Sequence, residues 1–168
     1  SCAARVIAST GATPYAVVAG ALAALSGHKH GGHTQRVRVL LDEIDQYGDF
    51  NSVIRSRLAR GDGIPGFGHV LYPDGDPRAA ALLAMVSETV PAAANRHRVE
   101  FIIRHETGKL PNIDYALVIL ERALELPLDA AFMLFTIGRS AGWIAHAIEQ
   151  YARPELLRPR AKYVGAMP

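Results

Sequence analysis

The segment of residues 61–78, GDGIPGFGHVLYPDGDPR, combines five glycines and three prolines with one histidine, His69. Glycine permits positive φ and close backbone approach, whereas proline fixes φ and removes a donor. Such a loop can present backbone groups to a flat ligand and hold a histidine at its rim. It closes on Asp76-Pro77-Arg78, a predicted N-cap, first helical residue and first-turn arginine. A cation there is unfavourable without a nearby anion, so Arg78 indicates an anionic ligand; an ordinary loop before a helix is the alternative.

Three histidines, His28, His30 and His33, lie within six residues of one another. This density suggests a metal site, but the nearest acidic residues are Asp42 and Glu43, and glycines separate His30 from His33. We therefore predict no metal. The glycines beside His30 fit better with a substrate that approaches the backbone there, and a helix-to-helix turn is the alternative.

A carboxylate and a further arginine stand at unusual positions. Asn112 predicts an N-cap that places Asp114 in the first turn of a helix, where the carboxylate could face a cleft. The alternative is a purely structural acid, which stabilises a helix start by about 0.3–1 kcal/mol. Arg139 lies in an apolar stretch between Phe135 and Trp143, so it should meet a carboxylate of the protein or of a ligand. Together these groups suggest acid–base chemistry on an anionic ligand.

Composition limits the possible classes of protein. The 168 residues suffice for one core, or for one domain and part of another, and 49% hydrophobic with 20% charged residues is typical of a soluble globular protein. A net charge of +2 without a basic run gives no argument for nucleic acid. The single cysteine, Cys2, excludes an internal disulfide and favours the cytoplasm. No signal peptide or membrane span is apparent, and a chain that opens on Ser1 inside a helix suggests a fragment of a longer protein.

Apolar residues at helical spacing predict an essentially all-α chain. Thr13 is predicted to cap a helix that has Pro14 as its first residue. This helix is rich in small residues and is predicted to be buried. Apolar side chains at helical spacing predict an amphipathic helix that ends near Gly48, with the stripe Val37, Leu40, Leu41 and Ile44. Asp49 or Asn51 is expected to cap the helix after it. The longest helix, from 128 to about 151, is predicted to turn four apolar side chains inward: Phe132, Phe135, Ile144 and Ile148.

Four blocks in this order resemble the citrate synthase family, the type II enzymes that condense acetyl-CoA with oxaloacetate. They are LSGHKHGG at 25–32, IPGFGHVLYPDGDPR at 64–78, LPNID at 110–114, and FTIGRSAGWIAHAIEQ with LLRPRAKYVG at 135–165. The resemblance covers nearly the whole chain. It implies a multihelical fold and an acyltransferase that converts the acyl group to alkyl on transfer, as in the tricarboxylic acid cycle.

The resemblance implies three catalytic residues. His30 would hydrogen-bond the thioester oxygen, His69 would protonate the oxaloacetate carbonyl, and Asp114 would take a proton from the acetyl methyl group. It also implies binding residues: Arg78, Arg139 and Arg158 for substrate carboxylates, Ile64, Pro65, Gly66, Phe67 and Gly68 for CoA, and Lys109 as a candidate for CoA phosphate.

The same resemblance implies a domain plan and an assembly. Residues 1–30 would be large-domain helices, 31–126 the small CoA-binding domain, and 127–168 the C-terminal large-domain helix and tail. A homodimer is expected, with Arg158 reaching the partner's site, and the expected partners are acyl-CoA and oxaloacetate, with no permanently bound cofactor, metal, nucleic acid or membrane. The family's upstream half is absent, so we expect the fragment to be inactive alone.

Two departures from the family pattern leave alternatives open. His33-Thr34 replaces a small residue and Asn, and Tyr115-Ala116-Leu117 follows Asp114 where many members have an aromatic residue and Ser-Gly. The alternatives are a 2-methylcitrate synthase that uses propionyl-CoA and a non-catalytic CoA-binding or interaction module.

Overall fold

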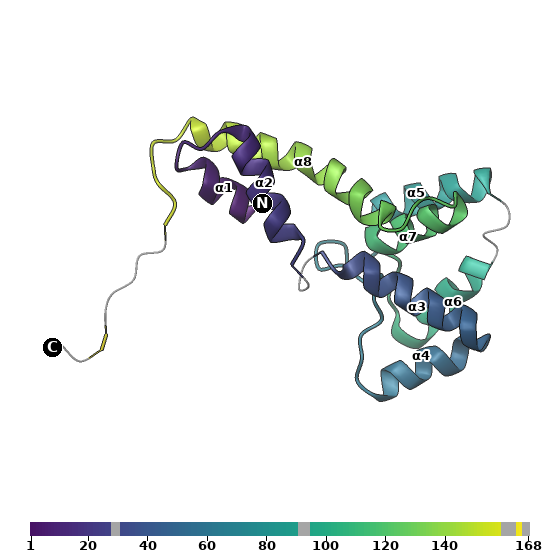
Figure 1. The fold of residues 1–168 in the computed structure, drawn as a ribbon. Helices are drawn as coiled ribbons and strands as arrows, with labels where there is room; N and C mark the ends of the chain where they lie inside the picture. Colours follow the sequence, from purple (N-terminus) through teal and green to yellow (C-terminus); the bar gives the residue numbers. More distant parts are fainter. Residues whose placement is uncertain (28–30, 91–94, 159–163, 166–168) are drawn as a thin grey trace. The chain divides into compact units, whose positions relative to one another are not determined.

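The computed structural model describes residues 1–27, 31–90, 95–158 and 164–165. Within these ranges the chain forms eight helices and no strand, which confirms the predicted all-α fold (Figure 1). None of the described helices is long and apolar enough to cross a membrane. In chain order the helices are α1 (Cys2–Ala8), α2 (Pro14–Leu25), α3 (His33–Tyr47), α4 (Phe50–Ala59), α5 (Pro77–Thr89), α6 (Asn95–Thr107), α7 (Ile113–Ala123) and α8 (Ala130–Tyr151).

Side-chain caps begin several of these helices. The Thr13 hydroxyl accepts the Ala16 N–H at 3.4 Å, and Pro14 follows as the first residue of α2. The Asp49 carboxylate accepts the Ser52 N–H at 3.2 Å at the start of α4. Each cap satisfies a backbone donor that has no partner inside the helix. The predicted cap at Thr13 is confirmed, and of the two candidates before α4 the structure has Asp49.

The chain divides into two compact units. Unit 1 comprises Ser1–Ser26 and Ile137–Pro168, and unit 2 comprises Gly27–Thr136. Helix α8 therefore starts in unit 2 and continues in unit 1. The predicted assignment of chain segments to a large and a small domain stays a prediction.

The hydrophobic core of unit 2 is organised around α7. This helix packs against α5 on one side and α3 on another, and it is buried over Tyr115–Ile119 without a break. An uninterrupted apolar run is expected for a helix that is covered on all sides. Helix α3 contributes the stripe that its spacing predicts: Val37, Leu40, Leu41 and Ile44. The core thus fixes α7, which carries Asp114 in its first turn.

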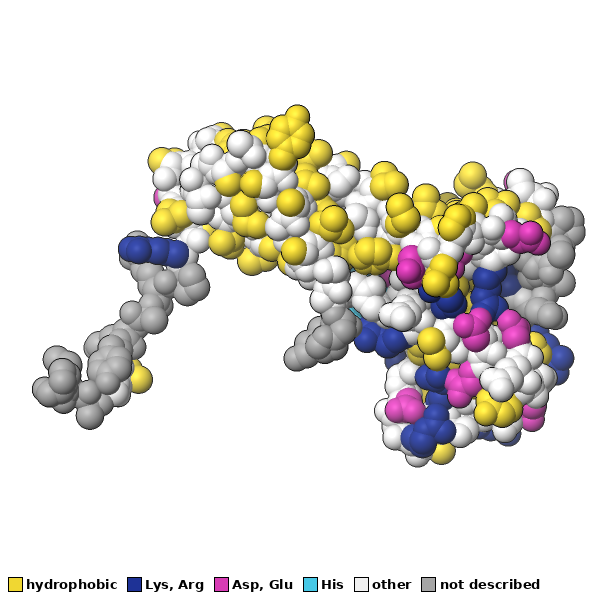
Figure 2. Space-filling model, viewed as in Figure 1, with side chains coloured by type: hydrophobic (Ala, Val, Ile, Leu, Met, Phe, Trp, Pro, Cys, Tyr) yellow, Lys and Arg dark blue, Asp and Glu magenta, His cyan; other side chains and the backbone are white. Residues whose placement is uncertain are grey.

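Unit 1 consists of α1, α2 and the later part of α8, and its apolar faces are more exposed than predicted. Tyr15 of α2 is 87% exposed, and of the inward set predicted for α8, Ile144 is 42% and Ile148 64% exposed. The predictions of a buried α2 and of inward Ile144 and Ile148 are therefore wrong for the described chain. Figure 2 shows apolar side chains gathered over α1, α2 and α8. An apolar stripe indicates that a face favours burial, but it does not say what covers that face.

Candidate functional site

Two loops of unit 2 are joined by backbone hydrogen bonds and form the frame of the site. The Gly68 N–H donates to the Leu110 carbonyl at 2.8 Å, and the Asn112 N–H donates to the Gly66 carbonyl at 2.9 Å. The Asn112 side-chain amide adds a bond to the Gly68 carbonyl at 3.0 Å. The glycine-rich loop that carries His69 is thereby held against the segment that leads into α7.

Gly66 is the tightest point of this frame. Its φ is +85°, and a Cβ there would lie 2.8 Å from Val37 Cγ2 and 2.9 Å from Tyr115 Cβ. Phe67, which directly follows Gly66, packs against Tyr115 with the two ring centres 4.7 Å apart. The loop therefore rests directly on α3 and α7, and only glycine fits at position 66 without strain.

A cavity of about 660 Å³ opens beside this loop, within the size range of small-molecule sites. The five residues predicted to hold CoA all line it, together with residues of α3 and α4. The side chains of Ile64 and Phe67 belong to the hydrophobic core, so the loop offers mainly backbone groups to the cavity. The full lining is His33, Gln35, Arg36, Val39, Arg57, Asp62, Gly63, Ile64, Pro65, Gly66, Phe67, Gly68 and Asn112.

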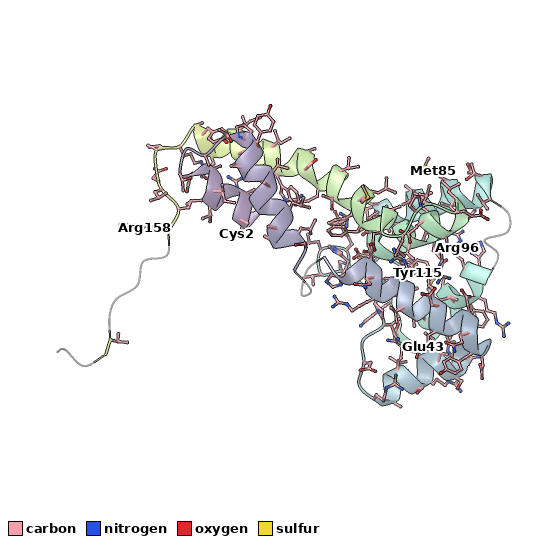
Figure 3. The ribbon with its side chains drawn as sticks, viewed as in Figure 1. Cys2, Glu43, Met85, Arg96, Tyr115 and Arg158 are labelled. Atoms are coloured by element: carbon pink, nitrogen blue, oxygen red, sulfur yellow. The ribbon has the colours of Figure 1, made fainter. Side chains whose placement is uncertain are left out.

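Basic side chains outnumber acidic ones in the lining of this cavity. His33 and Arg36 come from the first turns of α3, and Arg57 comes from α4, against one carboxylate, Asp62. Arg57 also donates to Glu43, which Figure 3 labels, at 2.9 Å. Lys109 runs along Gly68, where a Cβ would lie 3.2 Å from its Cδ, but it is not among the lining residues. Its assignment to a CoA phosphate stays a prediction.

Asp114 is held in the first turn of α7 by the cap that the sequence predicts. The Asn112 side-chain oxygen accepts the N–H of Asp114 at 3.0 Å and of Tyr115 at 3.4 Å. Burial raises the pKa of the Asp114 carboxyl above its ordinary value, and electrostatic interactions with His33, Arg78, His69 and Arg36 oppose this rise. The predicted base Asp114 therefore interacts electrostatically with the predicted site residues His69 and Arg78, all within unit 2.

His69 and Arg78 are oriented by local contacts. The His69 Nδ1 accepts the Leu71 N–H at 3.1 Å, so a neutral ring carries its proton on Nε2 and can donate it outward. Its ring centre lies 5.0 Å from that of Tyr72, and the Arg78 guanidinium lies 5.1 Å from the same Tyr72 ring. A proton donor and a cation therefore flank one aromatic ring.

Asp76 has a larger role than the N-cap that the sequence predicts. Its carboxylate accepts hydrogen bonds from Arg78 and from the Ile113 N–H at the start of α7. Burial alone would raise the pKa of Asp76, but these hydrogen bonds outweigh burial and hold that pKa below its ordinary value. Sequence analysis missed the link to α7, because only the fold brings residue 113 to residue 76.

Other predicted site residues fall outside this group. His28 and His30 lie outside the described residues, while Arg139 and Arg158 belong to unit 1. Arg139 donates to the Ser1 hydroxyl and makes no ion pair within the described ranges, so the carboxylate predicted for it is not found there. Arg158 is exposed in an irregular segment (Figure 3). Their roles, like that of His30, stay predictions.

Arg36 is one of several cavity residues that sequence reasoning overlooked. It stands three positions after His33 on α3, so the two share one helix face. That spacing, beside a histidine already noted as a departure from the family pattern, is the signal that could have found it.

No three His, Cys, Asp or Glu side chains of the described residues come together as metal ligands.

Comparison with known proteins identifies the family. The family described as citrate synthase, C-terminal domain, matches residues 1–160, so the chain belongs to the citrate synthase family. A relative from Mycobacterium tuberculosis is 40% identical over 177 residues, which cover 98% of this chain and 46% of that protein. The citrate/2-methylcitrate synthase of Bacillus subtilis is 36% identical, with 97% of this chain and 46% of that enzyme covered. The chain thus spans about half the length of these relatives.

Solved structures confirm the citrate-synthase-like fold. The citrate synthase of Thermoplasma acidophilum, in a ternary complex with carboxymethyl coenzyme A and oxaloacetate, superposes with a TM-score of 0.81 at 31% identity. That alignment covers 99% of this chain and 48% of the other. The Thermotoga maritima citrate synthase gives a TM-score of 0.79 at 33% identity, with the same two shares.

Proposed function

We propose that this chain carries the CoA-binding and proton-abstracting part of a citrate-synthase-type enzyme, which condenses acetyl-CoA with oxaloacetate. The observation that carries the proposal is the position of Asp114. Its half-buried carboxylate, with a raised pKa, acts electrostatically on Arg78 and His69, and its helix begins at the loop that borders the cavity. A carboxylate whose pKa lies nearer to working pH is a better general base, and surrounding cations suit a dianionic keto acid.

The chemistry assigns one step to each group. Asp114 takes a proton from the acetyl methyl group, and His30 donates a hydrogen bond to the thioester oxygen of the enolate. The enolate carbon attacks the oxaloacetate carbonyl carbon, whose oxygen receives the Nε2 proton of His69. Water then cleaves the citryl thioester and releases citrate and CoA. Arg78 binds a carboxylate of the keto acid, and Arg139 and Arg158, the latter from a second copy, complete the carboxylate set.

Gly66→Ala tests the CoA part of this proposal. The methyl group would collide with Val37 and Tyr115 at a residue with φ of +85°, so the loop must shift. We expect a loss of about 2–4 kcal/mol in the free energy of unfolding, from left-handed strain and overpacking together. In calorimetric titration we expect saturable CoA binding by the parent chain and at least about tenfold weaker binding by the folded variant.

Gly48→Ala is the matched control. Gly48 also has positive φ, +68°, but a Cβ there meets nothing within 4 Å and the residue is not part of the cavity. The control should lose stability through backbone strain alone and bind CoA like the parent. Equal binding by both variants, or no binding by a folded parent, contradicts the assignment of the cavity to CoA.

A second acyl donor is favoured by one relative. The Bacillus subtilis protein that is 36% identical is named for both citrate and 2-methylcitrate synthesis. Comparing CoA release from acetyl-CoA and from propionyl-CoA, each with oxaloacetate, separates the two activities. A higher kcat/KM for propionyl-CoA would assign the chain to 2-methylcitrate synthesis.

A further inference from the structure

The Asp76 carboxylate is used more fully than a helix cap requires. Its side chain is 0% exposed, and its two oxygens accept four hydrogen bonds. Oδ1 accepts the Arg78 N–H at 3.1 Å and Arg78 Nε–H at 2.9 Å. Oδ2 accepts Arg78 Nη2–H at 2.8 Å and the Ile113 N–H at 3.1 Å. A cap needs only the first of these bonds, and asparagine or serine could make it equally well.

Asp76 holds one edge of the Arg78 guanidinium, so the other edge is available to bind a ligand. Asp76 engages Nε and Nη2, while Nη1 has no hydrogen bond to any residue that the structure describes. Tyr72 supports the guanidinium at 5.1 Å, and the side chain keeps 46% of its surface exposed. A guanidinium held on one edge and exposed on the other can bind a carboxylate with little loss of side-chain entropy.

The fourth bond joins Asp76 to the helix that carries Asp114. The first N–H groups of a helix have no partner inside it. Asp76 takes the N–H of Ile113, and Asn112 takes those of Asp114 and Tyr115, so the first turn of α7 is fully satisfied by two side chains. Asp76 therefore belongs to the starts of both α5 and α7, and its negative charge suits both positive helix ends.

We propose that Asp76 is a positioning residue, which fixes the carboxylate-binding guanidinium of Arg78 relative to the base Asp114. This role rests on the proposed function. A cap needs only one of the four bonds, so capping alone does not account for a fully buried carboxylate with four donors. Because Asp76 contacts both elements, it fixes the distance between the guanidinium that binds the keto acid and the carboxylate that takes the methyl proton.

Asp76→Asn separates positioning from simple capping. Asparagine keeps the shape and one acceptor oxygen, so it still caps α5, but it loses the charge and cannot serve all four donors. In the full-length protein we expect KM for oxaloacetate to rise about tenfold or more, kcat to fall about tenfold to a hundredfold, and KM for acyl-CoA to stay within twofold. Amide exchange at Ile113 should become at least about tenfold faster, because its N–H loses its acceptor.

Asp74→Asn is the control. Asp74 lies two residues earlier in the same loop, is exposed, and makes no hydrogen bond or ion pair within the described residues. The Asp74→Asn variant should leave the kinetic constants and the amide exchange rate of Ile113 unchanged. In an Arg78→Gln background, Asp76→Asn should no longer raise KM for oxaloacetate, since it acts through Arg78.

The outcomes distinguish this inference from the proposed function. Unchanged KM values with unchanged exchange at Ile113 reduce Asp76 to a simple cap and overturn the inference, while CoA binding and turnover by the parent leave the proposed function intact. Equal increases in both KM values would show a general loss of structure and also overturn it. A folded parent that neither binds CoA nor condenses overturns the proposed function first, and with it the role of Asp76.

Discussion

Replacing Asp114 by asparagine is expected to lower the condensation rate by about 10³-fold, because a general base contributes about 10² to 10⁴ to a rate. Asparagine has nearly the same size and can occupy the same place in the first turn of α7, but it cannot accept the methyl proton. The rate is measured in the full-length protein as CoA release from acetyl-CoA plus oxaloacetate. CoA affinity should stay within about twofold of the parent, since the cavity is lined by other residues.

The same variant should be more stable than the parent near neutral pH. Burial raises the pKa of Asp114 above its ordinary 3.8, so the folded state disfavours the charged form. The contribution of this carboxyl to stability is complete below the unfolded value and is lost as pH rises through the folded value. Thermal unfolding from pH 4 to pH 7 should therefore show an advantage of Asp114→Asn that grows with pH. Asp74→Asn, at an exposed site, should show no such trend.

These two measurements also decide between an enzyme and a binding module. If the rate of Asp114→Asn stays within about threefold of the parent rate, Asp114 is not the general base. A full-length parent that binds CoA but forms no citrate would support the non-catalytic module instead. Loss of rate with a gain in stability is the pattern expected for a functional group that costs stability.

Local chemistry explains what the sequence could predict. The caps at Thr13, Asp76 and Asn112 were predicted and are confirmed by hydrogen bonds, because a cap depends on residues only two or three positions apart. The apolar stripe of α3 was predicted for the same reason. The all-α fold follows from many such local signals that agree with one another.

The arrangement of the site depends on contacts that no local pattern contains. Asn112 and Gly68 are 44 positions apart, yet their hydrogen bond helps to bring His69 towards the start of α7. The family resemblance identified the candidates His69, Arg78 and Asp114, but it did not reveal that Asp76 joins two of their elements. The exposed Ile148 is the opposite case, where a correct helix was predicted with a wrong environment.

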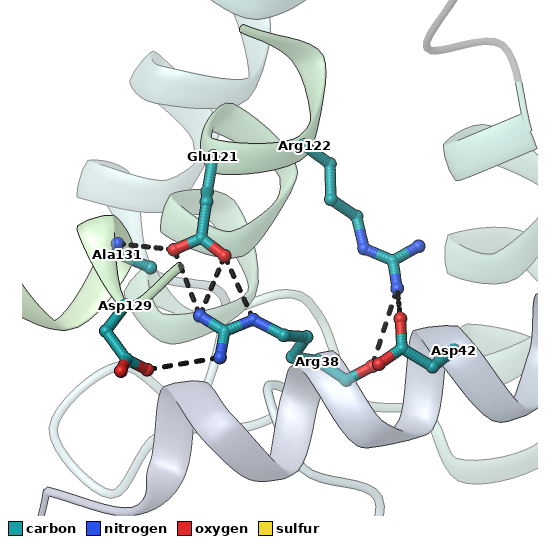
Figure 4. Close-up of polar contacts among 6 residues, drawn as sticks. All are labelled: Arg38, Asp42, Glu121, Arg122, Asp129 and Ala131. Atoms are coloured by element: carbon teal, nitrogen blue, oxygen red, sulfur yellow. Dashed lines mark hydrogen bonds and ion pairs between the residues drawn. The ribbon is translucent and has the colours of Figure 1, made fainter. Parts of the chain in front are cut away.

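The buried pair of Arg38 and Glu121 is a further contact of this kind, and 83 positions separate its members. Glu121 Oε1 accepts Arg38 Nε–H at 2.9 Å and Nη2–H at 2.7 Å, and Oε2 accepts the Ala131 N–H at 2.8 Å (Figure 4). Asp129 adds a bond to Arg38 at 3.2 Å. The pair therefore joins α3, α7 and the first turn of α8, all within unit 2.

Glu121→Ala is expected to destabilise unit 2 by about 3–5 kcal/mol, because it leaves a buried guanidinium without its main partner. The Glu121 and Arg38 side chains are only 6% and 14% exposed, so water replaces the lost bonds poorly, and the Ala131 N–H also loses its acceptor. In thermal or urea unfolding this corresponds to a fall in Tm of about 10 °C. Glu88→Ala is the control, since that glutamate is exposed on α5 and makes no ion pair within the described ranges; it should change stability by less than about 0.5 kcal/mol.

The double variant Arg38→Met with Glu121→Leu separates the cost of an unpaired charge from the value of the pair itself. Apolar replacement of both members of a buried ion pair is often neutral or stabilising, so the double variant should recover at least about half of the loss seen in Glu121→Ala. Arg122→Ala on the same helix removes bonds to the exposed carboxylates of Asp42 and Asp45, and such pairs contribute about 0–1 kcal/mol. If Glu121→Ala costs no more than Arg122→Ala, then water reaches Arg38 and the pair does not hold the start of α8.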